Sequence, residues 1–75
     1  MGGKCVEIYQ LRQFAAVAKT ENMTRAAQSL SMAQPAVSKT IRNLESELGA
    51  ELFERTGKGL RRTEQGDILL RYARA

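Results

Sequence analysis

The sequence predicts a mainly α-helical fold, in which a three-helix core is followed by a short β-hairpin and the start of a fourth helix. Apolar residues recur every three or four positions in four separate stretches, which is the spacing of amphipathic helices. A glycine-rich turn at residues 56–59 separates two short runs, which is typical of a hairpin. With 75 residues, two Phe, two Tyr and no Trp, the chain can form one small domain.

The first helix is expected to begin at Ile8 and to end near Lys19. Its apolar residues keep the helical spacing and are predicted to share one face: Ile8, Leu11, Phe14, Ala15 and Ala18.

The second helix is short and ends near Leu30. Asn22 and Thr24 are both good N-cap residues, and we favour Thr24 because Ala26 and Ala27 then fall inside the first turns. Small side chains at these two alanines would let a neighbouring helix approach closely.

The third helix is expected to run from Gln34 to Leu48, after a corner formed by residues 31–33. Pro35 is tolerated in a first turn, and Gly49 supplies the left-handed residue that ends the helix. The helix has two faces: an apolar stripe of Val37, Ile41, Leu44 and Leu48, and an opposite side with Pro35, Ser38, Lys39 and Arg42.

The hairpin is expected to pair residues 52–55 with residues 60–63 across the turn at 56–59. Thr63 then serves as the N-cap of a last helix that begins at Glu64. The apolar residues of this helix form one face that reaches almost to the final residue, so we expect the helix to continue elsewhere: Ile68, Leu69, Tyr72 and Ala73.

Two short helices joined by a three-residue corner form a helix-turn-helix, which offers its second helix to the DNA major groove. The Gln34 amide can donate to and accept from one adenine edge, and Pro35 offers an apolar face to a thymine methyl. Ser38 can bond to a base or a phosphate, while Lys39 and Arg42 add positive charge to the same side. These five residues are the predicted DNA-reading face.

The charge balance favours a polyanionic partner without proving one. Twelve Lys and Arg against eight Asp and Glu give a net charge of +4. Further candidates for DNA contact are Thr24, Arg55 and Lys58, with lower expectations for Arg61 and Arg62. Arg12 and Arg25 are as well explained by surface ion pairs with nearby Glu residues as by phosphate contacts. We expect Met23 and Met32 to fill the core, and Glu45 and Glu47 to lie on the solvated helix surface.

Composition also excludes several classes of protein. With no His and a single Cys, Cys5, disulfide staples and Cys/His metal sites are excluded, and a reduced, cytosolic setting fits best. Without paired carboxylates or a phosphate loop, an enzyme is not expected. No apolar run approaches the roughly 18 residues that span a bilayer, and no signal peptide is evident.

Three segments, AQPAVSKTIRNLE, ELGAELFER and TEQG, occur in an order and spacing that cover nearly the whole chain. On these segments the sequence from Leu11 to Gly66 strongly resembles the N-terminal DNA-binding domain of LysR-type transcriptional regulators. The resemblance implies a winged helix-turn-helix that binds inverted-repeat sites as a dimer, usually within a tetramer, under a C-terminal effector-binding domain. It also implies DNA contacts by Gln34, Pro35, Ser38, Lys39 and the wing-tip Lys58, and dimerisation through Ile68, Leu69 and Tyr72 of a linker helix.

The resemblance also implies how the chain is divided into segments. We expect residues 1–7 to be a flexible leader whose first three residues come from an expression vector, residues 8–63 to be the DNA-binding domain, and residues 64–75 to begin the linker helix. The effector domain is absent, so no cofactor is expected here, and a small-molecule co-inducer belongs only to that missing domain. An alternative is a winged-helix module for protein–protein interaction.

One position departs from the family pattern. Many members have Ser just before the Gln-Pro pair, where its hydroxyl can cap the recognition helix, but this chain has Ala33. Losing such a cap costs about 0.5 to 2 kcal/mol at comparable sites, so packing must compensate or a phosphate oxygen completes the cap.

Overall fold

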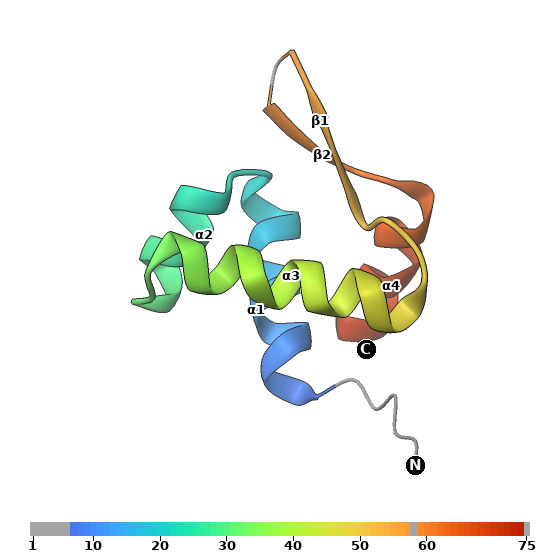
Figure 1. Cartoon of the computed structure of the whole chain (residues 1–75), viewed down its shortest axis with the longest axis horizontal. Helices are drawn as coiled ribbons and strands as arrows, with labels where there is room; N and C mark the ends of the chain where they lie inside the picture. The colour runs from blue at the N-terminus through green and yellow to red at the C-terminus, as the bar shows by residue number, and fades with distance from the viewer. Residues whose placement is uncertain (1–6, 58, 75) are drawn as a thin grey trace.

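A computed structural model describes residues 7–57 and 59–74, and for Arg74 the backbone alone. Cys5, Lys58 and the expected leader up to residue 6 lie outside the described residues. Within the described part, the elements follow in the order α1 (Ile8–Thr20), α2 (Met23–Leu30), α3 (Gln34–Leu48), β1 (Phe53–Thr56), β2 (Gly59–Arg62) and α4 (Glu64–Arg74). In Figure 1, α3 crosses the front of the molecule, α1 lies behind it, and the hairpin projects above both. The predicted fold class is confirmed.

The core lies where α1, α2 and α3 meet the base of the hairpin. Phe14 of α1 is fully buried and packs on Phe53 of β1, with ring centroids 5.4 Å apart. Ala26 and Ala27 are buried and join the same core, as their small size predicted. Met23 and Met32 are half-buried against it, which confirms their role as core filler.

The buried face of α1 is only partly the predicted one. Phe14 and Ala18 are buried, but Ile8, the first residue of the predicted apolar face, is 75% exposed. Gln10 and Gln13 lie on the buried face instead, together with Val17. Gln10 can be buried because its Oε1 accepts a hydrogen bond from the Glu7 N–H at 2.9 Å. The apolar pattern alone carried no sign of this bond.

The N-cap of α2 is Asn22, so the choice of Thr24 was wrong. The Asn22 Oδ1 accepts from the Arg25 N–H at 2.9 Å, and its backbone is extended. Thr24 therefore lies inside the first turn, where it is exposed.

Helix α3 begins and ends where the sequence predicted. Ala33 gives it no side-chain cap, and Gly49 ends it in the left-handed region with φ of 68°. Val37, Ile41 and Leu44 are buried, but Leu48, the last residue of the predicted apolar stripe, is 42% exposed. Leu48 lies in the last turn, beside an open apolar hollow that it shares with α4.

Both strands lie one residue closer to the turn than predicted, while residues 53–55 keep their predicted partners. Phe53 pairs with Arg62 and Thr56 pairs with Gly59, so the strands run one pair closer to the turn. Gly59 can be the first residue of β2 because its φ is 123°, a value that glycine adopts readily and other residues rarely adopt. Leu52 precedes β1, and its carbonyl oxygen accepts from the Thr63 N–H at 3.0 Å.

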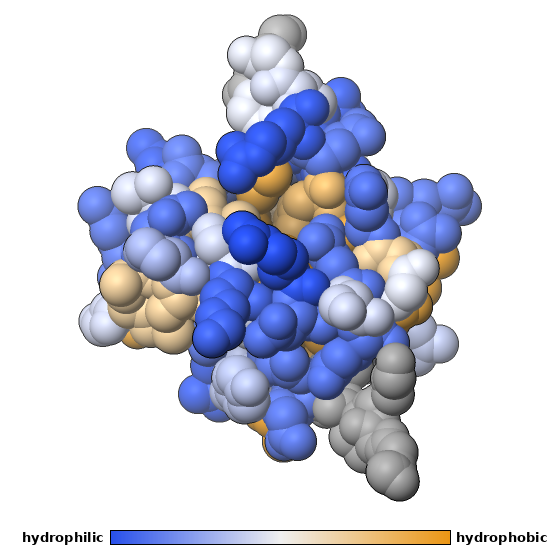
Figure 2. All heavy atoms as spheres, viewed as in Figure 1, coloured by the Kyte–Doolittle hydropathy of each residue, from blue (hydrophilic) through white to orange (hydrophobic). Residues whose placement is uncertain are grey.

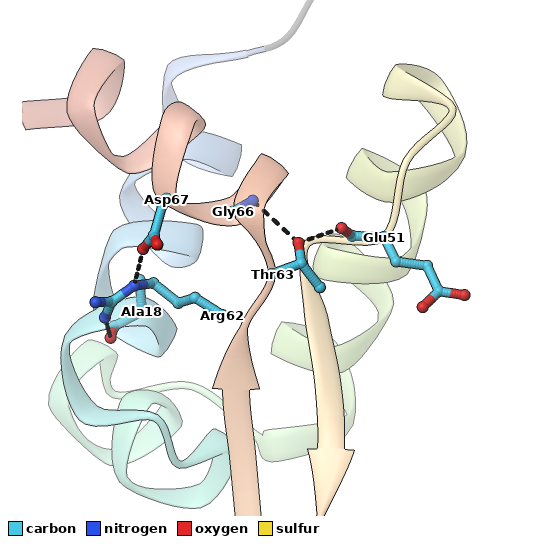
Figure 3. A network of polar contacts seen from close by, with 6 residues as sticks. All are labelled: Ala18, Glu51, Arg62, Thr63, Gly66 and Asp67. Carbon is cyan, nitrogen blue, oxygen red and sulfur yellow. Dashed lines mark hydrogen bonds and ion pairs between the residues drawn. The ribbon is translucent and has the colours of Figure 1, made fainter.

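Thr63 caps α4 as predicted, because its Oγ1 accepts from the Gly66 N–H at 3.1 Å. The same hydroxyl donates to the Glu51 carbonyl oxygen. Beside it, Arg62 bonds through Nε to Asp67 Oδ1 at 2.7 Å and through Nη1 to the Ala18 carbonyl oxygen at 2.8 Å. Figure 3 shows these contacts joining β2, α1 and the first turn of α4.

The predicted apolar face of α4 is largely open to solvent. Ile68 is 45% exposed and Tyr72 is 75% exposed, whereas Leu70, which the sequence analysis did not single out, is buried in the core. Leu69 and Ala73 are half-buried. Packing against α1 has therefore selected a side of α4 adjacent to the predicted one.

Candidate nucleic-acid interface

The first turn of α3 holds the two predicted base readers close together. Gln34 is the first residue of the helix, and Ser38 lies one turn further along the same side. The Gln34 Nε2 donates to the Ser38 Oγ at 2.9 Å, and both side chains are half-buried. This bond uses one N–H of the amide, so the carbonyl oxygen and the second N–H can still face a base edge.

The rest of the predicted reading face points outward. Pro35, Lys39 and Arg42 are exposed, directly opposite the buried Val37 and Ile41. Figure 2, drawn from the same side as Figure 1, shows a mainly hydrophilic surface along α3. Because α3 packs on the core through Val37 and Ile41, its other side presents polar groups to any partner that approaches.

Two hollows lie between the helices and the hairpin, and they gather residues that are distant in sequence. Thr24, Gln34 and Arg55 line the first, which has a volume of about 320 Å³. Ser38, Arg42 and Arg55 line the second, which has a volume of about 210 Å³. Hydrophobic side chains show between α3 and the hairpin in Figure 2, and Met23 and Leu60 line both hollows. We call the two hollows together the wing groove.

Of the seven predicted DNA-binding residues that the structure describes, the wing groove brings together five and leaves two outside. Thr24, Gln34, Ser38, Arg42 and Arg55 line it. Pro35 and Lys39 do not line it, although they are exposed on the same helix. Lys58 lies outside the described residues, so the structure gives no position for it.

Several cations of this side form no ion pair with any residue that the structure describes. Among the residues that the structure describes, the single ion pair joins Arg62 to Asp67. Lys39, Arg42 and Arg55 therefore present unneutralised charge, whereas Arg62 is engaged within the fold. Arg12 and Arg25 are exposed and also lack an ion pair with any described residue, and Arg12 lies in a separate hollow between α1 and α2.

The N-terminus of α3 adds an electropositive element. The Ala36 N–H already bonds to the Ala33 carbonyl oxygen at 3.0 Å, but no side chain caps the helix. The first backbone N–H of a helix and its dipole together favour an anion at this end. A phosphate close to the Gln34 N–H would meet both.

Two glutamates of α3 are not the solvated surface residues that the sequence predicted. Glu45 is half-buried in the lining of the wing groove, and its Oε2 accepts from the Leu52 N–H at 2.7 Å and the Phe53 N–H at 3.3 Å. Glu47 is half-buried, with one buried oxygen that has no hydrogen-bond partner among the described residues. Glu45 was missed because its partners lie seven and eight residues away, beyond the range of a helical pattern.

None of the helices in the described ranges is long and apolar enough to cross a membrane.

Comparison with known proteins connects this arrangement to a class of regulators. The family model described as "Bacterial regulatory helix-turn-helix protein, lysR family" matches residues 8–67. The RuBisCO operon transcriptional regulator of Allochromatium vinosum is 50% identical over 70 residues, which are 93% of this chain and 23% of that protein. The chain thus spans less than a quarter of the length of the curated relatives that it matches.

Comparison with solved structures gives the same family. The chain resembles a BenM DBD in complex with catB site 1 DNA, with a TM-score of 0.86 and 41% identity over 91% of this chain and 76% of that one. It also resembles a CbnR DBD in complex with DNA, with a TM-score of 0.87 and 39% identity over 92% of this chain and 79% of that one.

Proposed function

The chain belongs to the lysR family of bacterial regulatory helix-turn-helix proteins, as a DNA-binding domain, and on that premise we propose how it reads DNA. Helix α3 enters the major groove of a specific double-stranded site, and the β1–β2 wing lies on the adjacent backbone or minor groove. The observation that carries the proposal is the position of Gln34 and Ser38, which lie half-buried beside the buried face of α3 and line a groove flanked by the cations of Arg42 and Arg55.

Each residue has a distinct role in this proposal. Gln34 bonds to an adenine edge, and Pro35 contacts a thymine methyl. Ser38 bonds to a base or a phosphate, and Lys39 and Arg42 neutralise phosphates along the groove. Thr24 and Arg55 approach the backbone from the other side of the wing groove, and Lys58 is proposed at the wing tip on the resemblance alone.

The relatives support DNA as the partner rather than a protein. The BenM and CbnR domains were solved in complex with DNA, and full-length CbnR with its target DNA. We propose that this chain pairs with a second copy through Ile68, Leu69 and Tyr72 of α4 and binds an inverted repeat, as part of a tetramer in a longer protein. A co-inducer would bind to the effector domain of that protein, and this chain would need no cofactor.

Two further proposals concern catalysis and location. The RuBisCO operon regulator, BenM and CbnR are transcriptional regulators, and we propose that this chain likewise regulates without catalysing a reaction. Its place would be the bacterial cytoplasm, on the nucleoid.

Selection of bound duplexes from a random DNA pool, followed by sequencing, tests the proposal. We expect enrichment of an inverted repeat, and an affinity for it that falls log-linearly with salt, by about 0.9 log units per log unit of salt for each phosphate contacted. A pool without enrichment, or an affinity that salt leaves unchanged, would contradict DNA reading and favour docking through apolar surface.

A further inference from the structure

Most backbone N–H groups of the segment between α3 and β1 bond to one residue, Glu45. Its carbonyl oxygen accepts from the Gly49 N–H at 2.8 Å and the Ala50 N–H at 3.2 Å. Its carboxylate Oε2 accepts from the Leu52 N–H at 2.7 Å and the Phe53 N–H at 3.3 Å. Four backbone N–H groups of a five-residue segment therefore end on one side chain and its own backbone.

Apart from these hydrogen bonds, the surroundings of the Glu45 carboxylate disfavour its negative charge. It lies in the last turns of α3, where the helix dipole disfavours negative charge. It also lines the wing groove, where it repels the phosphates of a duplex. Hydrogen bonds from two backbone N–H groups to an ionised acceptor are strong enough to offset these costs.

The position of Glu45 on α3 connects the reading face to the wing. Ser38, Arg42 and Glu45 recur at helical spacing and line the same hollow. The Glu45 carboxylate also accepts a hydrogen bond from the N–H of Phe53, the first residue of β1. Phe53 in turn packs on Phe14 of the core. From Phe53 the strand leads directly to Arg55, on the opposite side of that hollow.

We propose that Glu45 is a positioning residue that fixes the wing relative to the reading face of α3, and so determines how much the wing adds to DNA affinity. Glu45 itself contacts no DNA. The inference rests on the proposed function for its DNA component, whereas the placement of the strand can be tested without DNA.

Three variants of the 75-residue chain test this role. Glu45→Ala removes the acceptor in a helix that tolerates alanine well, and Glu45→Gln removes the charge but keeps an acceptor oxygen. Glu51→Gln is the matched control, because Glu51 is exposed and its carboxylate points away from the network in Figure 3. All three variants lose one negative charge, which by itself can only strengthen binding to a polyanion.

For Glu45→Ala, we expect amide hydrogen exchange at Leu52 and Phe53 to rise by about tenfold or more, since each N–H loses its bond, while exchange at Ile41 stays unchanged. With the duplex enriched from the random pool, we expect an affinity about tenfold lower and a salt slope flatter by about one unit, as the wing loses a phosphate contact. Glu45→Gln should recover most of both effects. Glu51→Gln should leave exchange unchanged and affinity equal or higher.

Unchanged exchange at Leu52 and Phe53 in a folded Glu45→Ala chain would overturn the proposal. Raised exchange with an unchanged salt slope would also overturn it, because Glu45 would then hold the strand without placing the wing on DNA. A wild-type chain that binds no duplex would refute the proposed function and the DNA component together, and the exchange data alone would then decide whether Glu45 holds the strand.

Discussion

At the entrance of α3, Gln34 and Ser38 restrain each other through a 2.9 Å hydrogen bond before any duplex is present. A long side chain such as Gln loses rotamer freedom when it binds, at a cost of about 1 to 2 kcal/mol. Because the bond already limits that freedom, less has to be lost on contact with a base. Gln34 and Ser38, the proposed reading residues, are therefore preorganised by their mutual hydrogen bond as well as by the core behind them.

Replacing Gln34 by Ala should remove about 1 to 3 kcal/mol of discrimination at one base pair, because a bidentate contact to one base edge is lost. Binding to unrelated sequences should change little. Competition titrations with duplexes that differ at single positions measure both quantities. Gln28→Ala, at an exposed glutamine of α2, is the control, and equal weakening by Gln34→Ala on every sequence would disprove base reading by this residue.

Replacing Gly66 by Ala should destabilise the chain, although Gly to Ala inside a helix normally stabilises by about 0.5 to 1 kcal/mol. An added Cβ would lie 2.3 Å from the Leu52 carbonyl oxygen, which is backbone and cannot move alone. We expect a loss of about 1 to 3 kcal/mol in the free energy of unfolding, measured by urea titration. Gly57→Ala has no atom within 4 Å of its Cβ and should stay within about 0.5 kcal/mol of wild type.

The burial and the contacts of single residues were the hardest features to predict from the sequence. Ile8 has the right spacing for the core and lies exposed, while Gln13 is polar and buried. Glu45 looked like helix surface and holds the base of the wing. In each case the outcome depends on where a distant segment packs, which local hydropathy does not encode.

At the scale of elements, the N-cap of α2 can be identified by mutating the two candidate residues, Asn22 and Thr24, separately. Asn22→Ala removes the acceptor of the Arg25 N–H and should cost about 0.5 to 2 kcal/mol of stability. Thr24→Ala changes an exposed residue within α2 and should cost less than about 0.5 kcal/mol. Thermal unfolding of the two variants ranks them, and a larger loss from Thr24→Ala would show that the cap is misassigned.

The base of the wing is held on its other side by Arg62. Its ion pair with Asp67 is partly exposed, with side-chain exposures of 32% and 53%, so Asp67→Asn should cost less than about 1 kcal/mol. Arg62→Ala should cost about 1 to 3 kcal/mol, because the Ala18 carbonyl oxygen also loses its donor. Chemical denaturation compares them, and equal losses would mean that the bond to Ala18 adds nothing.

Whole elements were more predictable than their contacts. The bounds of α3 followed from Pro35 and Gly49, whose backbone preferences are local. The hairpin was predicted with the correct pairing of residues 53–55 to residues 60–62, but both strands reach one residue closer to the turn than predicted, since Gly59 can either belong to the turn or begin a strand. The two N-cap candidates of α2 could not be ranked without knowing where Met23 packs.

At the scale of the molecule, the sequence predicted a reading helix, a wing and a further apolar helix, and these parts are present in the predicted order. It could not show that α2, α3 and β1 surround one groove, because that depends on packing around the buried Phe14 and Phe53. The wing groove and the apolar face of α4 are lined by different residues. The proposed contacts with a duplex and with a second copy therefore use different residues of the chain.

The central claim is that the outward side of α3 and the facing strand of the wing meet the duplex. A titration of the isotopically labelled chain with the enriched duplex, followed by amide chemical shifts, tests it most directly. We predict the largest shifts in residues 34–42 and 54–57 and at Thr24, with little change at the buried Phe14. Shifts confined to α1 and α4, with the first half of α3 unchanged, would contradict the account.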